Sequence, residues 1–458
     1  MLALAPRLRR AGDRGASSEG RRPTVTPTAL AVLAFAVTSA FALSVLGGLL
    51  GFIARDDHPV SPELAQLSGT YVMLASTAVV LLLVPLAALG GAAARLGVAR
   101  RDARLATLRL LGVTPREVVA LTLVETAWQG LAGAALGVAG YGLLLPLWTR
   151  IPFQGQPFSA SELWVGWVPL VCTLVAVPAL AAVSGAVSLR RVVVSPLGVS
   201  RRTTPPGMHG VRALVVVVAV AGFVVVSQSV GMLGPAIGLL VLLGALAAVF
   251  GTLNLVGPWT LSVLGRVMAR TARTPATLLA ARRLLDDPRG AWRVVGGLGL
   301  ASFVAGVLSV LPGLAATDTT GDPAGAILVR DLVTGGLLTL GIAFTVAATS
   351  AGIMAAATVL DRRREYALQR LAGVPVELFD AVRRREVIVP MVFVSGTSVA
   401  VALVVLLPLV GVAGALDPTG LLALAACLLV GGALVVGATE TSRPLLRAVL
   451  QETVVRAD

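Results

Sequence analysis

The sequence predicts an all-α, polytopic membrane protein of about ten transmembrane helices, arranged as two parallel four-helix repeats and a two-helix connector. Three observations predict this class. Of the 458 residues, 56% are hydrophobic and 13% are charged, and the mean hydropathy of +0.90 is far above that of a soluble domain. The apolar residues form uncharged runs long enough to cross a bilayer. A basic segment also occurs twice, and a constant shift in residue number aligns its two copies.

The apolar runs predict ten membrane-spanning segments, because about 20 apolar residues cross the hydrocarbon layer as a helix. A helix satisfies all its backbone hydrogen bonds within the segment, so the spans are predicted to be helical. Apart from Arg212, Glu125 and Glu440 near segment ends, these segments contain no Asp, Glu, Lys, Arg or His. The expected segments are 28–54, 67–94, 118–147, 163–189, 211–231, 235–257, 294–316, 332–360, 387–413 and 418–440.

All 37 basic residues are arginines, and they concentrate in alternate loops. Cytoplasmic loops of membrane proteins carry the excess of basic residues, so these loops and both termini are predicted to be cytoplasmic. Only Arg55, Arg150 and Arg330 fall on the other side, which leaves 37 − 3 = 34 arginines inside. The net charge of +14 therefore indicates topology and contact with anionic membrane lipid, and nucleic acid is not an expected partner.

The loops on the other side are short, so no large extracellular domain is expected. Aromatic residues flank the third and fourth spans and are expected to form an interfacial belt, as aromatic side chains do where helices leave the bilayer. These residues are Trp148, Phe153, Phe158, Trp164 and Trp167.

The predicted organisation has five parts. Residues 1–26 are expected to form a disordered, arginine-rich cytoplasmic tail. The first four-helix repeat occupies 27–189 and the second occupies 294–441. A connector at 190–293 contains two helices, and 442–458 form the second cytoplasmic tail. Six helices separate the two basic segments, so both repeats enter the membrane in the same direction and the repeat is parallel.

Each repeat carries its basic segment after its second span, and we predict an amphipathic helix that ends at glycine. In the first copy leucines recur every three residues beside arginines, and Gly112 follows as the C′ residue. Thr114, Pro115 and Glu117 then provide the signals that start the next helix. The candidate docking residues are Arg101, Arg104, Leu105, Leu108, Arg109 and Gly112 in the first copy, and Arg362, Arg364, Glu365, Arg370 and Gly373 in the second.

The same shift aligns Glu125 with Glu386, as it aligns Gly112 with Gly373. Three arginines, 383–385, directly precede Glu386, and they cannot lie in hydrocarbon at a tolerable cost. Both glutamates are therefore predicted to lie at one depth near the cytoplasmic interface. The hypothesis is that each glutamate pairs with an arginine of the adjacent basic helix. The alternative is a solvated interfacial acid with no special role.

The residue inventory excludes several enzyme classes. No lysine occurs, so the chain has neither a P-loop nor a Schiff-base lysine. The two histidines, His58 and His209, and the two cysteines, Cys172 and Cys427, lie far apart, which supports neither a metal site nor a disulfide framework. We therefore expect no catalytic residue, cofactor or metal in this chain.

The segment LDRRREYALQRLAGV at 360–374 resembles the segment after the second membrane helix of FtsX-like permease domains. RDARLATLRLLGVTPREVVALTLVE at 101–125 is similar to a second, weaker example, with Arg104 where the second copy has Glu365. The resemblance covers both four-span blocks. The layout is similar to that of antimicrobial-peptide exporters of the bacitracin-resistance type, from which this chain differs by lacking the large extracellular domain.

The resemblance implies the permease subunit of a bacterial ABC transporter in the plasma membrane. The two basic helices would be coupling helices that bind a separate P-loop ATPase dimer, and the substrate would be amphipathic or lipid-like, such as an antimicrobial peptide. One alternative is a non-transporting relay that passes ATPase motion to an extracytoplasmic partner. An ion-driven secondary transporter is a further alternative, which the lack of ionisable residues inside the predicted spans disfavours.

Overall fold

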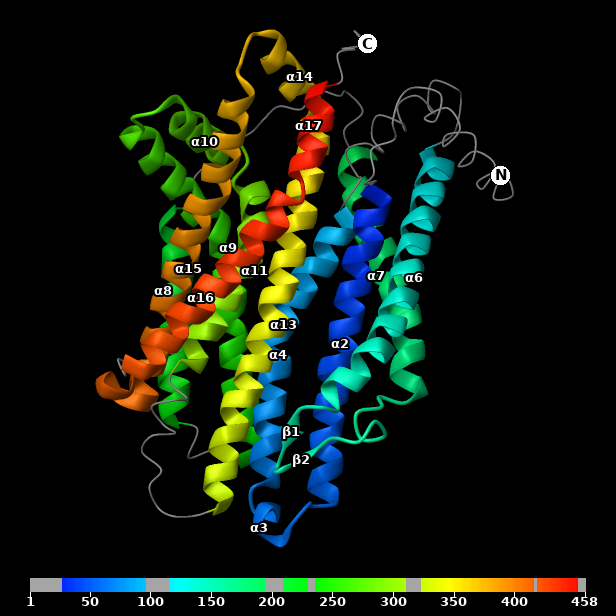
Figure 1. The fold of residues 1–458 in the computed structure, drawn as a ribbon, viewed down its shortest axis with the longest axis vertical. Helices are drawn as coiled ribbons and strands as arrows, with labels where there is room; N and C mark the ends of the chain where they lie inside the picture. Colours follow the sequence, from blue (N-terminus) through cyan, green and yellow to red (C-terminus); the bar gives the residue numbers. More distant parts are fainter. Residues whose placement is uncertain are drawn as a thin grey trace.

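The computed structural model describes residues 27–95, 115–193, 209–229, 235–309, 323–415 and 418–451. These ranges form a bundle of long helices with a small β-hairpin, so the predicted all-α class is confirmed (Figure 1). Nine helices within the described ranges are long and apolar enough to cross a membrane. The remaining predicted span, 211–231, coincides with helix α8 (His209–Ser229).

The first block of helices contains α2 (Pro27–Asp57), α4 (Ser68–Arg95), α6 (Pro115–Trp148) and α7 (Trp167–Val193), with the short helix α3 (Pro62–Ala65) between α2 and α4. Helices α2 and α6 pack closely because glycines of α6 face α2. A Cβ atom at Gly133 would lie 2.4 Å from the Cβ of Phe35, and one at Gly137 would lie 2.5 Å from the Cβ of Ser39. Small residues at such contacts allow the backbones of membrane helices to approach each other.

The loop after α6 contains the antiparallel strands β1 (Pro152–Phe153) and β2 (Gln156–Pro157). Arg55, at the end of α2, is 3% exposed and holds this loop. Its Nε donates to Glu162 at 2.8 Å, and its terminal nitrogens donate to the carbonyls of Phe153 at 2.8 Å and Pro157 at 2.9 Å. Burial alone would raise the pKa of Glu162, but hydrogen bonds from Arg55 and Ser159 outweigh burial and hold that pKa below its usual value.

The aromatic residues near this loop divide into two groups. Phe153 and Phe158 are buried and meet Phe52 edge-to-face, with ring centroids 5.4 and 5.1 Å away. The expected interfacial belt is therefore wrong for these two residues, because the hairpin folds them into the protein. Trp164 and Trp167 are exposed, as belt residues would be.

The connector contains α8, α9 (Pro235–Thr271) and α10 (Pro275–Asp286). The sixth expected span ends at 257, but α9 continues to Thr271, and α10 occupies much of the expected basic loop. Local caps explain the boundaries of α10. The Thr274 hydroxyl accepts a hydrogen bond from the Thr277 N–H at its start, and Asp287 ends it. Asp287 also caps the next helix by accepting from the Gly290 N–H at 2.9 Å.

The second block contains α11 (Pro288–Leu308), α13 (Pro323–Asp361), α14 (Arg363–Leu371), α15 (Val376–Ala415), α16 (Pro418–Glu440) and α17 (Arg443–Gln451). The starting residues of two of its helices correspond to those of two helices in the first block. Helix α11 begins at Pro288 and α15 begins at Val376, whereas α2 begins at Pro27 and α6 begins at Pro115. Both pairs of starting residues are related by the shift that aligns Gly112 with Gly373.

Several boundaries of the second block differ from the expected segments, including the start of α15 at Val376 instead of 387. Helix α11 begins at Pro288 instead of 294, because Asp287 caps it and proline is favoured in the first helical turn. Helix α13 begins at Pro323 instead of 332, so Arg330 and Asp331 lie inside a membrane-spanning helix that is predicted to lack ionisable side chains. The expected tail after residue 441 contains α17, whose Leu446 is 2% exposed.

Helices α4 and α13 lie side by side at the centre and join the two blocks (Figure 1). A single cluster of buried residues crosses this interface and includes Leu82 and Leu89 of α4, Phe303 of α11 and Phe344 of α13. Helices α10, α14 and α17 lie at one end of the bundle, here named the arginine-rich end, whereas α3, β1 and β2 lie at the opposite end, here named the hairpin end (Figure 1).

Candidate functional site

The second basic segment forms helix α14, and Gly373 follows the helix as its C′ residue, as predicted. Gly373 has φ +85°, the left-handed conformation that glycine adopts at low cost. Its N–H donates to the carbonyl of Arg370 at 2.9 Å, and the N–H of Val374 donates to the carbonyl of Gln369 at 3.2 Å. These two bonds are the pair that defines a Schellman motif. The motif reverses the chain so that α15 begins at Val376.

One face of α14 is buried through Tyr366, which is 4% exposed. Its ring meets the ring of Phe379 on α15 edge-to-face at 5.8 Å. The guanidinium of Arg283, from α10, lies 5.2 Å from the centre of the Tyr366 ring and donates to Oε1 of Gln369 at 3.3 Å. Burial raises the pKa of Tyr366, although the charge of Arg283 opposes the shift, so the hydroxyl stays protonated at neutral pH.

The opposite face of α14 is exposed. Leu368 is 50% exposed and Leu371 is 70% exposed, and Glu365 is exposed one turn before Leu368, whereas the exposed Arg370 lies one turn after Tyr366. Apolar side chains in the open on a polar helix are typical of a surface that binds a partner. The sequence prediction named the charged residues of this face but missed both leucines.

Glu386 joins this helix to the membrane-spanning helices. Its Oε1 lies 3.6 Å from a terminal nitrogen of Arg362, the residue that precedes α14, and its Oε2 lies 3.6 Å from a terminal nitrogen of Arg283. The side chain of Arg283 is 7% exposed and that of Glu386 is 21% exposed. One carboxylate on α15 therefore faces arginines from α10 and from the start of α14. The pairing with Arg362 is the kind of contact that the sequence hypothesis described for Glu386.

The first copy is described only in part. Glu125 lies in α6, where its Oε1 accepts from Nε2 of Gln129 at 3.4 Å. Helix α6 begins at Pro115 and α15 begins at Val376, so Glu125 and Glu386 lie equally far from the starts of equivalent helices. The candidate docking residues of the first basic segment lie outside the described residues; these are Arg101, Arg104, Leu105, Leu108, Arg109 and Gly112.

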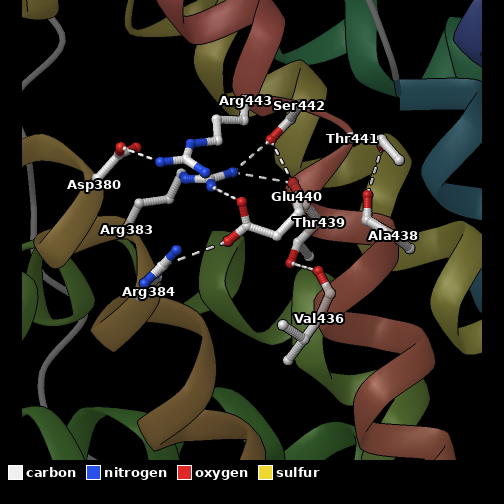
Figure 2. Close-up of polar contacts among 10 residues, drawn as sticks. All are labelled: Asp380, Arg383, Arg384, Val436, Ala438, Thr439, Glu440, Thr441, Ser442 and Arg443. Carbon is white, nitrogen blue, oxygen red and sulfur yellow. Dashed lines mark hydrogen bonds and ion pairs between the residues drawn. The ribbon is translucent and has the colours of Figure 1, made fainter.

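A second ionic cluster joins α15 to the end of α16 (Figure 2). Arg383 donates to Oε2 of Glu440 at 2.7 Å and to the carbonyl of Thr439 at 3.0 Å. Arg384 lies 3.6 Å from Oε1 of the same glutamate, and Arg443 donates to Asp380 at 3.0 Å. These contacts connect α15, α16 and α17, and α17 in turn packs against α14.

Sequence reasoning missed Arg283, Tyr366 and Gln369 at this site. Arg283 lies in a stretch that is predicted to be a basic loop, where an arginine is expected to be exposed, but it is only 6% exposed. The available signal was the helical spacing of apolar residues in 275–286, which places Ala276, Ala280 and Leu284 on one buried side of α10, the helix that contains Arg283.

Residues 76–197, from within α4 to just beyond α7, match the family model described as the FtsX-like permease C-terminal domain. This range includes the first basic segment and Glu125. No curated protein and no solved structure matches the chain significantly. The resemblance to FtsX-like permeases is thus confirmed over residues 76–197, and the chain is a multi-pass membrane protein that contains an FtsX-like permease domain.

Proposed function

We propose that this chain is the membrane subunit of a bacterial ABC transporter, and that a separate P-loop ATPase dimer drives it. FtsX-like permeases generally partner with an ABC ATPase. The arginine-rich end and both termini would lie in the cytoplasm of a plasma-membrane protein, since arginines are enriched there and cytoplasmic loops carry such residues. Two FtsX-like repeats, 27–189 and 294–441, would flank the connector 190–293.

The observation that carries the proposal is the two-faced structure of α14. Its exposed leucines and charged residues offer a surface for a protein partner, while Tyr366 on the other face packs against α15 and Arg283. A push on such a helix is passed to the helices beneath it because packed interiors deform little. The first basic segment would provide an equivalent surface, so that one chain binds both protomers of the ATPase.

Glu386 is proposed to be the coupling residue of the second repeat. It contacts Arg362 before α14 and Arg283 of α10, and it lies on the same helix as Arg383, which binds Glu440. Movement of α14 would therefore reach α15 and α16 together. Glu125 is proposed to have the same role in the first repeat.

The proposed substrate is amphipathic or lipid-like, and the proposed transport is export or extraction from the membrane. A mostly apolar cavity of about 310 Å³ at the hairpin end supports transport over a pure signal relay, since a relay needs no ligand space. Small-molecule sites usually occupy roughly 300–1,000 Å³.

The test uses a tagged chain purified from membranes of the source bacterium. We expect the wild type to carry a P-loop subunit and to hydrolyse ATP. Changing both Leu368 and Leu371 to Glu should lower the co-purified ATPase at least tenfold. Leu278→Glu is the matched control, because Leu278 is 43% exposed on α10 at the same end.

The proposal would be abandoned if no ATPase accompanies the wild type, or if the paired change and the control behave alike. An ATPase that co-purifies but never responds to an added amphipathic peptide such as bacitracin would favour the relay.

A further inference from the structure

A cavity lies between the two helical blocks at the hairpin end. Helices α2 and α4 form one side, α13 and the end of α11 form the other, and α6 and the loop that contains β1 and β2 complete the lining. Its volume is about 310 Å³. The loop is held in place by buried Arg55, so the cavity is part of the folded structure.

The walls of this cavity are mostly apolar and partly aromatic. Phe52 stacks on Tyr71 with ring centroids 5.7 Å apart, and Phe153 and Phe158 lie edge-on to Phe52. All four rings line the cavity. Aromatic faces attract cations, and the attraction is stronger where water is excluded.

Asp331 is the sole charged side chain among the described residues that line the cavity. It lies on α13 and is 6% exposed. Its Oδ2 accepts two hydrogen bonds, from the Tyr71 hydroxyl at 2.8 Å and from the Gln154 N–H at 2.6 Å. Within the described part of the chain, Oδ1 receives no hydrogen bond, so this oxygen is available to a ligand.

Within the described ranges, no arginine forms an ion pair with this carboxylate, and the peptide between Phe153 and Gln154 separates it from Arg55. Arg55 does not line the cavity, and its guanidinium binds Glu162 and loop carbonyls. Arg330 precedes Asp331 in the chain but is exposed and does not line the cavity. A buried carboxylate without a positive partner is costly, and a bound cation would relieve that cost.

Polarity varies along the cavity in the direction of the membrane normal. Asp331 and the hairpin lie at one end, and residues 71 to 82 of α4 line the wall from there inward, roughly 16 Å of helix at 1.5 Å per residue. The inner part is lined by Leu81, Leu82 and Ile342. A ligand would therefore place a positive group near the membrane surface and an apolar body toward the bilayer centre.

We propose that this cavity binds a lipophilic cation, with its positive group beside Oδ1 of Asp331 and its apolar body among the rings and aliphatic side chains. An acidic or zwitterionic phospholipid fits less well, because its phosphate would be near the carboxylate. This inference names a substrate class for the transporter proposed above and rests on that function for its biological role. Binding itself requires no ATPase.

The experiment measures binding to the purified chain in phosphatidylcholine nanodiscs without any ATPase. The probes are tetraphenylphosphonium and tetraphenylborate, which have the same shape and opposite charge, with empty nanodiscs as the blank. We expect saturable binding of the phosphonium at one site and at least tenfold weaker binding of the borate. Asp331→Asn should weaken phosphonium binding at least tenfold, while its amide oxygen can still accept from Tyr71 and Gln154.

Two further variants make the result specific. Glu63→Gln removes an exposed carboxylate on α3 at the same end and should leave binding unchanged. Gly48→Leu should weaken binding by filling the cavity, since Gly48 lines it and a Cβ there meets no atom within 4 Å.

Equal binding of both probes, or phosphonium binding that survives both Asp331→Asn and Gly48→Leu, would overturn the inference. Because no ATPase is present, such a result would leave the proposed function standing. Failure of the co-purification test would in turn leave the binding result intact.

Discussion

The carboxylate of Glu386 lies 3.6 Å from the guanidinium of Arg362, the residue at which the chain passes from α13 into α14. Both side chains are mostly buried, at 21% and 20% exposed. Glu386 also faces Arg283, so this one acid on α15 links the start of α14 to α10. The contact makes the coupling hypothesis testable by single substitutions.

Glu386→Gln should uncouple the proposed ATPase from the membrane helices. The complex should still assemble and hydrolyse ATP, because the exposed face of α14 is unchanged. The reporter is a single cysteine in place of Thr77, which lines the cavity at the hairpin end, in a protein whose Cys172 and Cys427 are replaced. Its maleimide labelling should change with ATP in the otherwise wild-type protein, and Glu386→Gln should abolish that change. Loss of the charge leaves Arg283 without its carboxylate, at a cost of about 1–3 kcal/mol measurable as a lower Tm.

Glu377→Gln is the control for that experiment, because Glu377 is an exposed carboxylate in the first turn of the same helix α15. In this control variant, maleimide labelling of the cysteine at position 77 should respond to ATP as it does in the wild type. If the Glu386→Gln protein also keeps the full response, Glu386 has no coupling role.

Gly373→Val should weaken ATPase association, whereas Gly373→Asn should preserve it. The left-handed backbone costs a non-glycine residue about 1–2 kcal/mol, and asparagine tolerates it better than a β-branched residue. A Cβ at Gly373 meets no atom within 4 Å, so space does not distinguish the variants. Since about 1.4 kcal/mol is tenfold, the affinity should fall roughly tenfold for valine. Equal co-purification of both variants would show that this backbone conformation is not needed for docking.

Cysteines at 125 and 386 should react alike with a reagent added from the cytoplasmic side, if the two glutamates share one depth. The two positions lie equally far along α6 and α15, which begin at Pro115 and Val376. A cysteine at Leu136, an exposed position farther along α6, should be protected by lipid. A thiol at 125 that is sealed while the one at 386 reacts would refute the shared depth.

Glu162→Gln should remove a pH-dependent stabilisation of the hairpin loop. The pKa of Glu162 is lowered in the folded state, so its contribution is fully present above the ordinary glutamate pKa of about 4.3 and is lost as pH falls through the lowered folded pKa. The Tm difference between wild type and variant should be constant above about pH 5 and shrink at lower pH. A difference that grows on acidification would contradict the assigned pairing with Arg55.

Local sequence patterns determined much of this protein. Apolar runs predicted the membrane class and most spans, since the hydrophobicity and the length of a run are local properties of the sequence. The shift that aligns the two basic segments also relates the starts of α11 and α15 to those of α2 and α6 in the structure. The left-handed Gly373 was also predicted, because a helix C-terminus is specified within a few residues.

Contacts between distant segments were decided only by the tertiary structure. Tyr71 and Asp331 are far apart in the sequence, and only the packing of α4 against α13 brings the hydroxyl within 2.8 Å of the carboxylate. The sequence placed Arg283 in a basic loop, but in the structure α10 holds it close to Tyr366 of α14 and Glu386 of α15. The sequence placed Phe153 at the membrane interface, but the hairpin buries its ring. Local patterns carry secondary structure and burial tendency, whereas a site assembled from several helices depends on how the whole bundle packs.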